Sequence, residues 1–376
     1  MSQLASRIDS VDVVHHEVGL PNSLQDATQT IDRFEYVLVH LSAGDHKGTG
    51  WAYTTGFGGA AVADLVRECL VEVTLGRAVG EIRDAWGRGR AALDRGGYGN
   101  HASLALGAVD IARWDLAART IDEPLYALLG GSRRRCATYG SGVDLGDSPA
   151  ELADRVHDTL EAGYPAVKIK LGGDPAVNRQ RLRAVRGRIG HEVPLFVDAN
   201  TAWTRDVAQR HVDDLTHAQV AFLEEPFPIE DAAAYRAFSG TAGIPLAGGE
   251  TAHSASTLLP YVNERLLGIL QPDICRIGGI TEWLRIAHAA EIARVPLTTH
   301  FTIELAAHLA AAVPGVRYVE ITDHNLTHLG LVRGGVDIGP GWIQPIEDAG
   351  HGLEWAFPAD SIVSATTHAD PTRKPA

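Results

Sequence analysis

The chain has 376 residues, 45% of them hydrophobic and 21% charged, a composition typical of a globular protein with a sizeable core. Its length predicts two or three units, or one barrel with an accessory domain. A formal net charge of −14 argues against nucleic-acid or anionic-membrane partners. No apolar run reaches the roughly 18 residues that span a bilayer, and the polar start lacks an export signal, so we expect a cytoplasmic protein.

The first hundred residues mix predicted strands, over 34–41 and 48–53, with a helical stretch over 60–75. A polar segment, 21–30, and a glycine-rich segment, 54–59, lie between these elements. Neither matches a phosphate-binding motif, so both are predicted to be lid loops. A helix over 104–119 follows, and the glycine stop at Gly130 and Gly131 predicts the end of the first domain.

From about residue 135, short apolar strands alternate with amphipathic helices. The predicted strands end roughly 20 to 30 residues apart, which is the size of a βα unit. Eight such units predict a (β/α)8 barrel. The predicted strand ends lie near Gly140, Lys170, Asp198, Glu224, Glu250, Asp273, His300 and Glu320.

Lys168 and Lys170 lie on one of these predicted strands, in a chain with only four lysines. Residues two apart share a face of a strand, so the two ammonium groups point the same way. Each would then lower the pKa of the other, which prepares a lysine to accept a proton. The alternative is an exposed edge strand with two solvated lysines.

Three acids, Asp198, Glu224 and Glu250, end consecutive predicted strands at an even spacing of 26 residues. One carboxylate after a strand is usually a helix cap, but three in consecutive units should converge at the carboxyl end of a barrel. Their mutual repulsion requires a cation. Oxygen ligands without clustered Cys or His favour Mg²⁺ over zinc.

His300 ends the strand after the one that carries Asp273, so the carboxylate is expected to fix the histidine tautomer and raise its basicity. A lysine pair and a histidine on opposite sides of a metal suit removal of a proton α to a carboxylate. Glu320, if protonated, would donate a hydrogen bond to the resulting enediolate.

In this order, the motifs resemble the mandelate racemase branch of the enolase superfamily, over most of the chain. The resemblance rests on the 108–115 helix, the 124–131 turn, Lys168-Ile169-Lys170, Val197-Asp198-Ala199-Asn200, Glu224-Glu225-Pro226, Gly249-Glu250, Gln271-Pro272-Asp273, Arg276-Ile277-Gly278-Gly279, His300 and Glu320. The segment 348–353 follows the family's closing Gly-x-Gly only loosely.

The resemblance implies a modified TIM (β/α)8 barrel over residues 131–345 and an α+β capping domain over 1–130, with lid loops near 15–30 and 51–60. The tail, 346–376, would pack on the capping domain. The second lysine of the family's Lys-x-Lys motif and the histidine of its dyad are the acid/base groups, and they correspond to Lys170 and His300. Lys168 would tune the pKa of Lys170 and contact the substrate carboxylate. Asn200 and Ser141 correspond to substrate-binding positions. A homo-oligomer is expected.

The same site could return the proton to the other face of the substrate, as a racemase or epimerase of an α-hydroxy acid. It could also expel a β-hydroxyl, as a dehydratase. The hydrogen-bonding side chains of segment 21–30 favour a polyhydroxy acid, so we predict a sugar-acid dehydratase acting on a small-molecule carboxylate. A non-catalytic barrel is the third reading, and the intact set of acids and bases argues against it.

Overall fold

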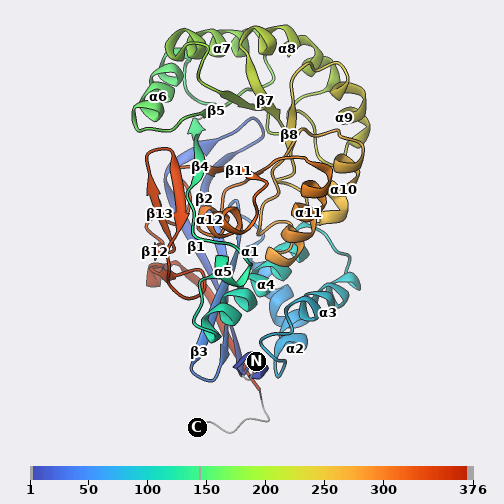
Figure 1. Ribbon diagram of the computed structural model, residues 1–376, viewed down its shortest axis with the longest axis vertical. Coiled ribbons are helices and arrows are strands. Elements are labelled where there is room, and N and C mark those ends of the chain that lie inside the picture. The colour runs from blue at the N-terminus through green and yellow to red at the C-terminus, as the bar shows by residue number, and fades with distance from the viewer. Residues whose placement is uncertain (1–2, 144, 371–376) are drawn as a thin grey trace.

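The computed structural model describes residues 3–143 and 145–370. They form an antiparallel sheet with helices on one side, which we call the cap, and a parallel barrel that the cap covers (Figure 1). The predicted fold class, a barrel with an α+β cap, is confirmed. No helix among these residues combines the length and the apolar character needed to cross a membrane.

The cap sheet has the strand order β16-β1-β2-β3. Its strands are β1 (Ser10–Gln25), β2 (Thr30–Ala43), β3 (His46–Thr54) and β16 (Ile362–Ala369). The first two form a long hairpin in which Gln25 pairs with Thr30. The polar segment predicted as a loop over 21–30 is therefore mostly strand, and only residues 26–29, the lid turn, connect the two strands. The strand was not predicted because this end of the hairpin is exposed, so its residues are polar and lack the apolar alternation of a half-buried strand.

The helix predicted over 60–75 consists of α1 (Gly59–Leu65), a π-helical turn (Val66–Leu70) and α2 (Val71–Thr74) in succession. Then come α3 (Ile82–Asp94), α4 (Asn100–Thr120) and α5 (Leu125–Leu128). Helix α4 is buried on nearly every side, because it lies against the cap sheet and also contacts the barrel. Gly50 of β3 permits this approach, since a Cβ there would lie 2.2 Å from the Ala108 carbonyl oxygen.

Eight parallel strands form the barrel, which closes where β11 pairs with β4. The strands are β4 (Cys136–Val143), β5 (Val167–Lys170), β6 (Leu195–Asp198), β7 (Val220–Glu224), β8 (Leu246–Gly248), β9 (Ile269–Leu270), β10 (Leu297–Thr299) and β11 (Val316–Ile321). The helices between them are α6 (Pro149–Glu161), α7 (Pro175–Ile189), α8 (Arg205–His217), α9 (Ala232–Ser239), α10 (Ala255–Asn263), α11 (Ile280–Ala293) and α12 (Ile303–Ala312).

Each helix follows a strand, except that β11 leads into short strands instead of an eighth helix. Thr204 caps α8, because its side chain accepts a hydrogen bond from Val207 N. Inside the barrel, aromatic rings fill the lower layer, with Phe196 and Phe222 stacked at 4.1 Å between centroids. This packed floor leaves the polar side chains at the carboxyl ends of the strands.

After β11 the chain forms β12 (Val332–Gly334), β13 (Val336–Gly339), β14 (Trp342–Pro345) and β15 (Leu353–Trp355), and it then returns to the cap sheet as β16. Of these, β14 pairs with the barrel strand β4. The buried Asp115 of α4 joins three segments at this return. Its carboxylate accepts hydrogen bonds from Thr49 N of β3 (2.8 Å), His351 N (2.8 Å) and Arg119 Nε (2.9 Å). The closing segment Gly350-His351-Gly352 is thereby held against the cap.

Candidate active site

A cavity lies between the barrel mouth and the cap hairpin. Its barrel side contains ionisable and polar residues from the strand ends. Its cap side contains Asp26, Thr28 and Gln29 of the lid turn together with the apolar residues Leu24, Ile31 and Phe34. Such a mixed, concave surface at the carboxyl ends of barrel strands is the expected position for substrate.

The lysine pair lies inside the barrel, which excludes the solvated edge strand. Lys168 is 3% exposed, and its Nζ lies 2.9 Å from both carboxylate oxygens of Glu224 and 2.6 Å from Glu320 Oε1. Lys170 Nζ lies 3.0 Å from Asn200 Oδ1 and 3.4 Å from Asp198 Oδ2. Both lysines line the cavity.

The expected lowering of the lysine pKa values is wrong for this arrangement of charges. Burial and the neighbouring Lys168 do lower the pKa of Lys170, but Asp198 and Glu250 outweigh them, so the net shift is upward. Burial is likewise outweighed at Lys168, where Glu224 and Glu320 raise the pKa well above its usual value. The attraction of these carboxylates, which come from other strands, exceeds the repulsion between the two ammonium groups.

The three acids predicted as metal ligands come from neighbouring positions at the barrel mouth. Asp198 and Glu224 are paired residues of β6 and β7, and Glu250 follows β8. Burial raises the pKa of Glu224 to about 8, with Asp198, Glu320 and Glu250 adding to the shift and Lys168 opposing it. This repulsion between oxygen donors is the chemistry that a hard divalent cation relieves.

All three acids contact cationic side chains here. Glu224 binds Lys168, Asp198 Oδ2 lies 3.4 Å from Lys170 Nζ, and Glu250 Oε2 lies 3.1 Å from His300 Nε2. Among the residues that the structure describes, no group of three His, Cys, Asp or Glu side chains is drawn together as a finished metal site. The donor types therefore fit Mg²⁺, while their present cationic contacts are with Lys168, Lys170 and His300.

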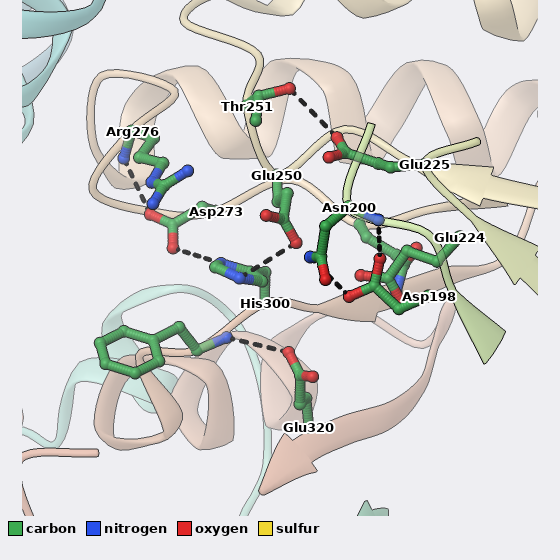
Figure 2. Close-up of polar contacts among 12 residues, drawn as sticks. Asp198, Asn200, Glu224, Glu225, Glu250, Thr251, Asp273, Arg276, His300 and Glu320 are labelled. Atoms are coloured by element: carbon green, nitrogen blue, oxygen red, sulfur yellow. Dashed lines mark hydrogen bonds and ion pairs between the residues drawn. The ribbon is translucent and has the colours of Figure 1, made fainter. Parts of the chain in front are cut away.

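His300 lies between two carboxylates (Figure 2), with its Nδ1 2.8 Å from Asp273 Oδ2 and its Nε2 toward Glu250. Burial lowers the pKa of His300, but Glu250 and Asp273 outweigh it and raise the value to about 9. Asp273 is completely buried, which would raise its pKa, yet the hydrogen bond from His300 makes the net shift downward. The predicted pairing of His300 with Asp273 is thus present in the structure.

Glu320 and Ser141 lie on the adjoining strands β11 and β4. Burial raises the pKa of Glu320, but Lys168, His300 and a hydrogen bond from Ser141 lower it to about 2. The condition for Glu320 to donate to an enediolate, a protonated carboxyl group, is therefore not met, because Lys168 Nζ lies 2.6 Å from Glu320 Oε1. Asn200 donates through Nδ2 to Asp198 Oδ2 and accepts from Lys170, so it is positioned beside the predicted base.

Four further side chains belong to this site and were not predicted. Tyr53 and Arg276 flank Asp273, Gln271 Nε2 donates to Glu224 Oε2 at 2.8 Å, and Glu225 accepts from Thr251 Oγ1. Burial raises the pKa of Glu225 well above its usual value, and Glu250, Asp198 and Glu224 add to the shift. Glu225 could have been predicted, because it directly follows the predicted ligand Glu224 in the sequence. Tyr53 could not, because it lies on a cap strand far from the barrel residues in the sequence.

Family models match both parts of the chain. Residues 9–130 match the mandelate racemase / muconate lactonizing enzyme N-terminal domain, and residues 151–359 match the enolase C-terminal domain-like family. A 3,6-anhydro-alpha-L-galactonate cycloisomerase from Streptomyces coelicolor is 34% identical over 308 residues, which cover 81% of this chain and 85% of that protein.

Solved structures agree over nearly the whole length. A racemase from Streptomyces coelicolor A3(2) with bound magnesium is 32% identical, with a TM-score of 0.88 over 93% of this chain and 97% of that one. L-talarate dehydratase from Polaromonas sp. JS666, complexed with Mg and L-glucarate, is 29% identical, with a TM-score of 0.89 over 97% and 100% of the two chains. With this fold and these matches, the chain belongs to the mandelate racemase/muconate lactonizing enzyme group of the enolase superfamily.

Proposed function

We propose that the protein is a Mg²⁺-dependent dehydratase of a sugar acid, an aldonate or aldarate. It would remove the proton α to the carboxylate and eliminate the β-hydroxyl, giving a 2-keto-3-deoxy acid. The observation that carries this proposal is that Lys170 and His300 face one cavity from β5 and from the end of β10, three strands apart around the barrel. Two proton-transfer groups thus approach a substrate from different sides.

Asp198, Glu224 and Glu250 would hold the metal, which when bound supplies positive charge to the substrate carboxylate as negative charge develops on it. Their oxygen donors and mutual repulsion support this assignment, and the Mg-bound relatives are consistent with it. Lys168 would hold a substrate carboxylate oxygen through its ammonium group, and Glu320, as an anion, would orient Lys168.

The elimination step uses two proton-transfer groups of this chain. One of Lys170 and His300, in its uncharged form, takes the α-proton, and the other, in its protonated form, donates a proton to the β-oxygen as the C–O bond breaks and water leaves. The enol then takes a proton at C3 and becomes the ketone. Asn200 would hold Lys170 toward the substrate through the 3.0 Å contact. Asp273 would keep the other ring nitrogen of His300 occupied, so that Nε2 exchanges the proton.

A second candidate is a sugar-acid cycloisomerase, favoured by the relative that is 34% identical. In a 3,6-anhydro sugar acid the β-oxygen belongs to a ring ether. Abstraction of the α-proton followed by loss of that oxygen opens the ring, and the product is an isomer of the substrate. The same two proton-transfer groups serve this reaction, because only the leaving oxygen differs.

The test is proton NMR and mass spectrometry of the purified protein with Mg²⁺ in D₂O, against aldonic, uronic and aldaric acids, anhydro sugar acids and simple α-hydroxy acids. A keto-deoxy product lacking one water supports the dehydratase, and an isomeric keto-deoxy product moves the assignment to the cycloisomerase. Inversion at the α-carbon without elimination indicates a racemase or epimerase. Absence of α-proton exchange with every acid would overturn the proposal, including its catalytic premise.

A further inference from the structure

Tyr53 is the point at which the cap reaches the pair formed by His300 and Asp273. Its hydroxyl, on β3, donates to Asp273 Oδ2 at 2.7 Å. His300 Nδ1 lies 2.8 Å from the same oxygen. One carboxylate oxygen is therefore shared by a cap side chain and by the histidine that faces the cavity.

The remaining contacts of Asp273 fix its carboxylate plane. Its Oδ1 accepts from Arg276 N at 2.8 Å, so the carboxylate has three donors in all. Burial raises the pKa of Tyr53 well above its usual value, and the phenol consequently keeps its proton and acts as a donor to Asp273. Without that donor, the carboxylate would be held by Arg276 N and by the histidine that it is meant to orient.

The contact belongs to a fixed junction between the cap and the barrel loop 273–279. Cys275 Sγ donates to Trp51 O at 3.3 Å, and Trp86 Nε1 donates to Gly278 O at 2.8 Å. The Arg276 guanidinium lies 5.4 Å from the centre of the Tyr53 ring. Tyr53 thus lies on a buried strand between these contacts and also lines the cavity, and its hydroxyl position is set by the docking of the cap.

We propose that Tyr53 is a positioning residue through which the docked cap orients Asp273 and His300. Proton transfer on the His300 face of the substrate then depends on the Tyr53 hydroxyl, while transfer on the Lys170 face does not. This inference rests on the proposed function, because it assumes that each of the two groups takes the α-proton from one of the two C2 epimers.

The test compares Tyr53→Phe with Tyr36→Phe. Tyr36 pairs directly with Tyr53 across β2 and β3, is equally buried, and its hydroxyl has no hydrogen-bond partner in the part of the chain that the structure describes. Both changes keep the aromatic ring and remove one buried hydroxyl. Exchange of the α-proton in D₂O is measured with both C2 epimers of a sugar acid, after Lys170→Ala and His300→Asn have shown which epimer each group deprotonates.

We expect Tyr53→Phe to slow exchange of the His300-face epimer by about 10- to 100-fold, the range for losing one hydrogen bond to a charged acceptor. Exchange on the Lys170 face should stay within about two-fold, as should both faces in Tyr36→Phe, because neither loses a contact of the base. Equal slowing on both faces, or no slowing on the His300 face, would overturn the inference.

A double variant excludes a general packing effect. In the Asp273→Asn background, Tyr53→Phe should slow His300-face exchange by no more than about two-fold further, since the acceptor through which it acts has changed. A full additional 10- to 100-fold loss would show that Tyr53 acts elsewhere. Failure of the proposed function is a distinct result, because wild-type protein would then exchange neither epimer.

Discussion

Replacing Asp115 by Ala should destabilise the protein strongly, since this side chain joins the cap sheet, α4 and the closing segment. It is completely buried and accepts from Thr49 N, His351 N and Arg119 Nε. Removal leaves two backbone N–H groups and one guanidinium N–H without this acceptor. Breaking a buried charged pair costs about 3–5 kcal/mol, and we expect a loss in that range.

The corresponding change in melting temperature follows from chain length. An unfolding entropy of about 2.1 cal/mol/K per residue gives roughly 0.8 kcal/mol/K for this chain, so the expected decrease in Tm is about 4–6 °C. Differential scanning calorimetry of Asp115→Ala measures it, with Mg²⁺ held constant because a ligand that binds only the folded state raises Tm.

Asp94→Ala is the matched control. Asp94 forms the same kind of i,i+4 pair, with Arg90 Nε at 2.9 Å, but its side chain is 51% exposed. Exposed pairs contribute about 0–1 kcal/mol, so Tm should fall by no more than about 1 °C. Equal shifts in Asp115→Ala and Asp94→Ala would refute the reasoning, because Asp115 differs from Asp94 in its burial and in the two backbone N–H groups that it accepts from.

Chelation should abolish turnover, and Mg²⁺ should restore it, because the acids at the barrel mouth repel one another; activity assays after dialysis measure this. Asn200→Ala should lower kcat about 10-fold by freeing Lys170, as steady-state kinetics will show. Asp26→Ala removes the acceptor of the Thr28 and Gln29 backbone N–H groups in the lid turn. It should raise KM more than it lowers kcat, which substrate titration measures. Gly279→Ala should destabilise the junction by at least about 2 kcal/mol in thermal unfolding, since φ is +96° and a Cβ would lie 2.5 Å from Asp110 Oδ2.

Each of these expectations has a contradicting result. Full activity after thorough chelation rules out the metal, and an unchanged kcat in Asn200→Ala removes the support proposed for Lys170. A KM unaffected by Asp26→Ala separates the lid turn from the substrate. Wild-type stability in Gly279→Ala would mean that α4 and the 273–279 loop adjust freely; Gly87→Ala, where a Cβ meets nothing within 4 Å, serves as its control.

The barrel was predictable because the strands of a (β/α) repeat recur at a regular interval and end at polar residues. Every predicted barrel strand except the one ending near Gly140 finished at an ionisable residue, and Asp198 and Glu224 are indeed paired positions. The pairing of His300 with Asp273 followed from the same geometry. These features depend on a local period and on the closure of a parallel barrel, both of which sequence reasoning captures.

The ionisation states were not predictable, because they depend on distances between residues far apart in the chain. A donor role for Glu320 depended on burial keeping it protonated, but Lys168 at 2.6 Å reverses the shift of its pKa. The hairpin end at 21–25 was missed because exposed strands lose the apolar alternation. Strand β16 was missed for the same reason, since its residues are partly or fully exposed along its length.

Strand β16 completes the cap sheet only after the rest of the chain has been synthesised. Ser10 of β1 pairs with Ala369 of β16, roughly 360 residues later, with the entire barrel between them in the chain. During synthesis, the barrel strands emerge before β16, the strand that completes the cap sheet. An incomplete chain released after β11 could not cover this sheet edge, so premature release should yield molecules that expose an unpaired strand and aggregate.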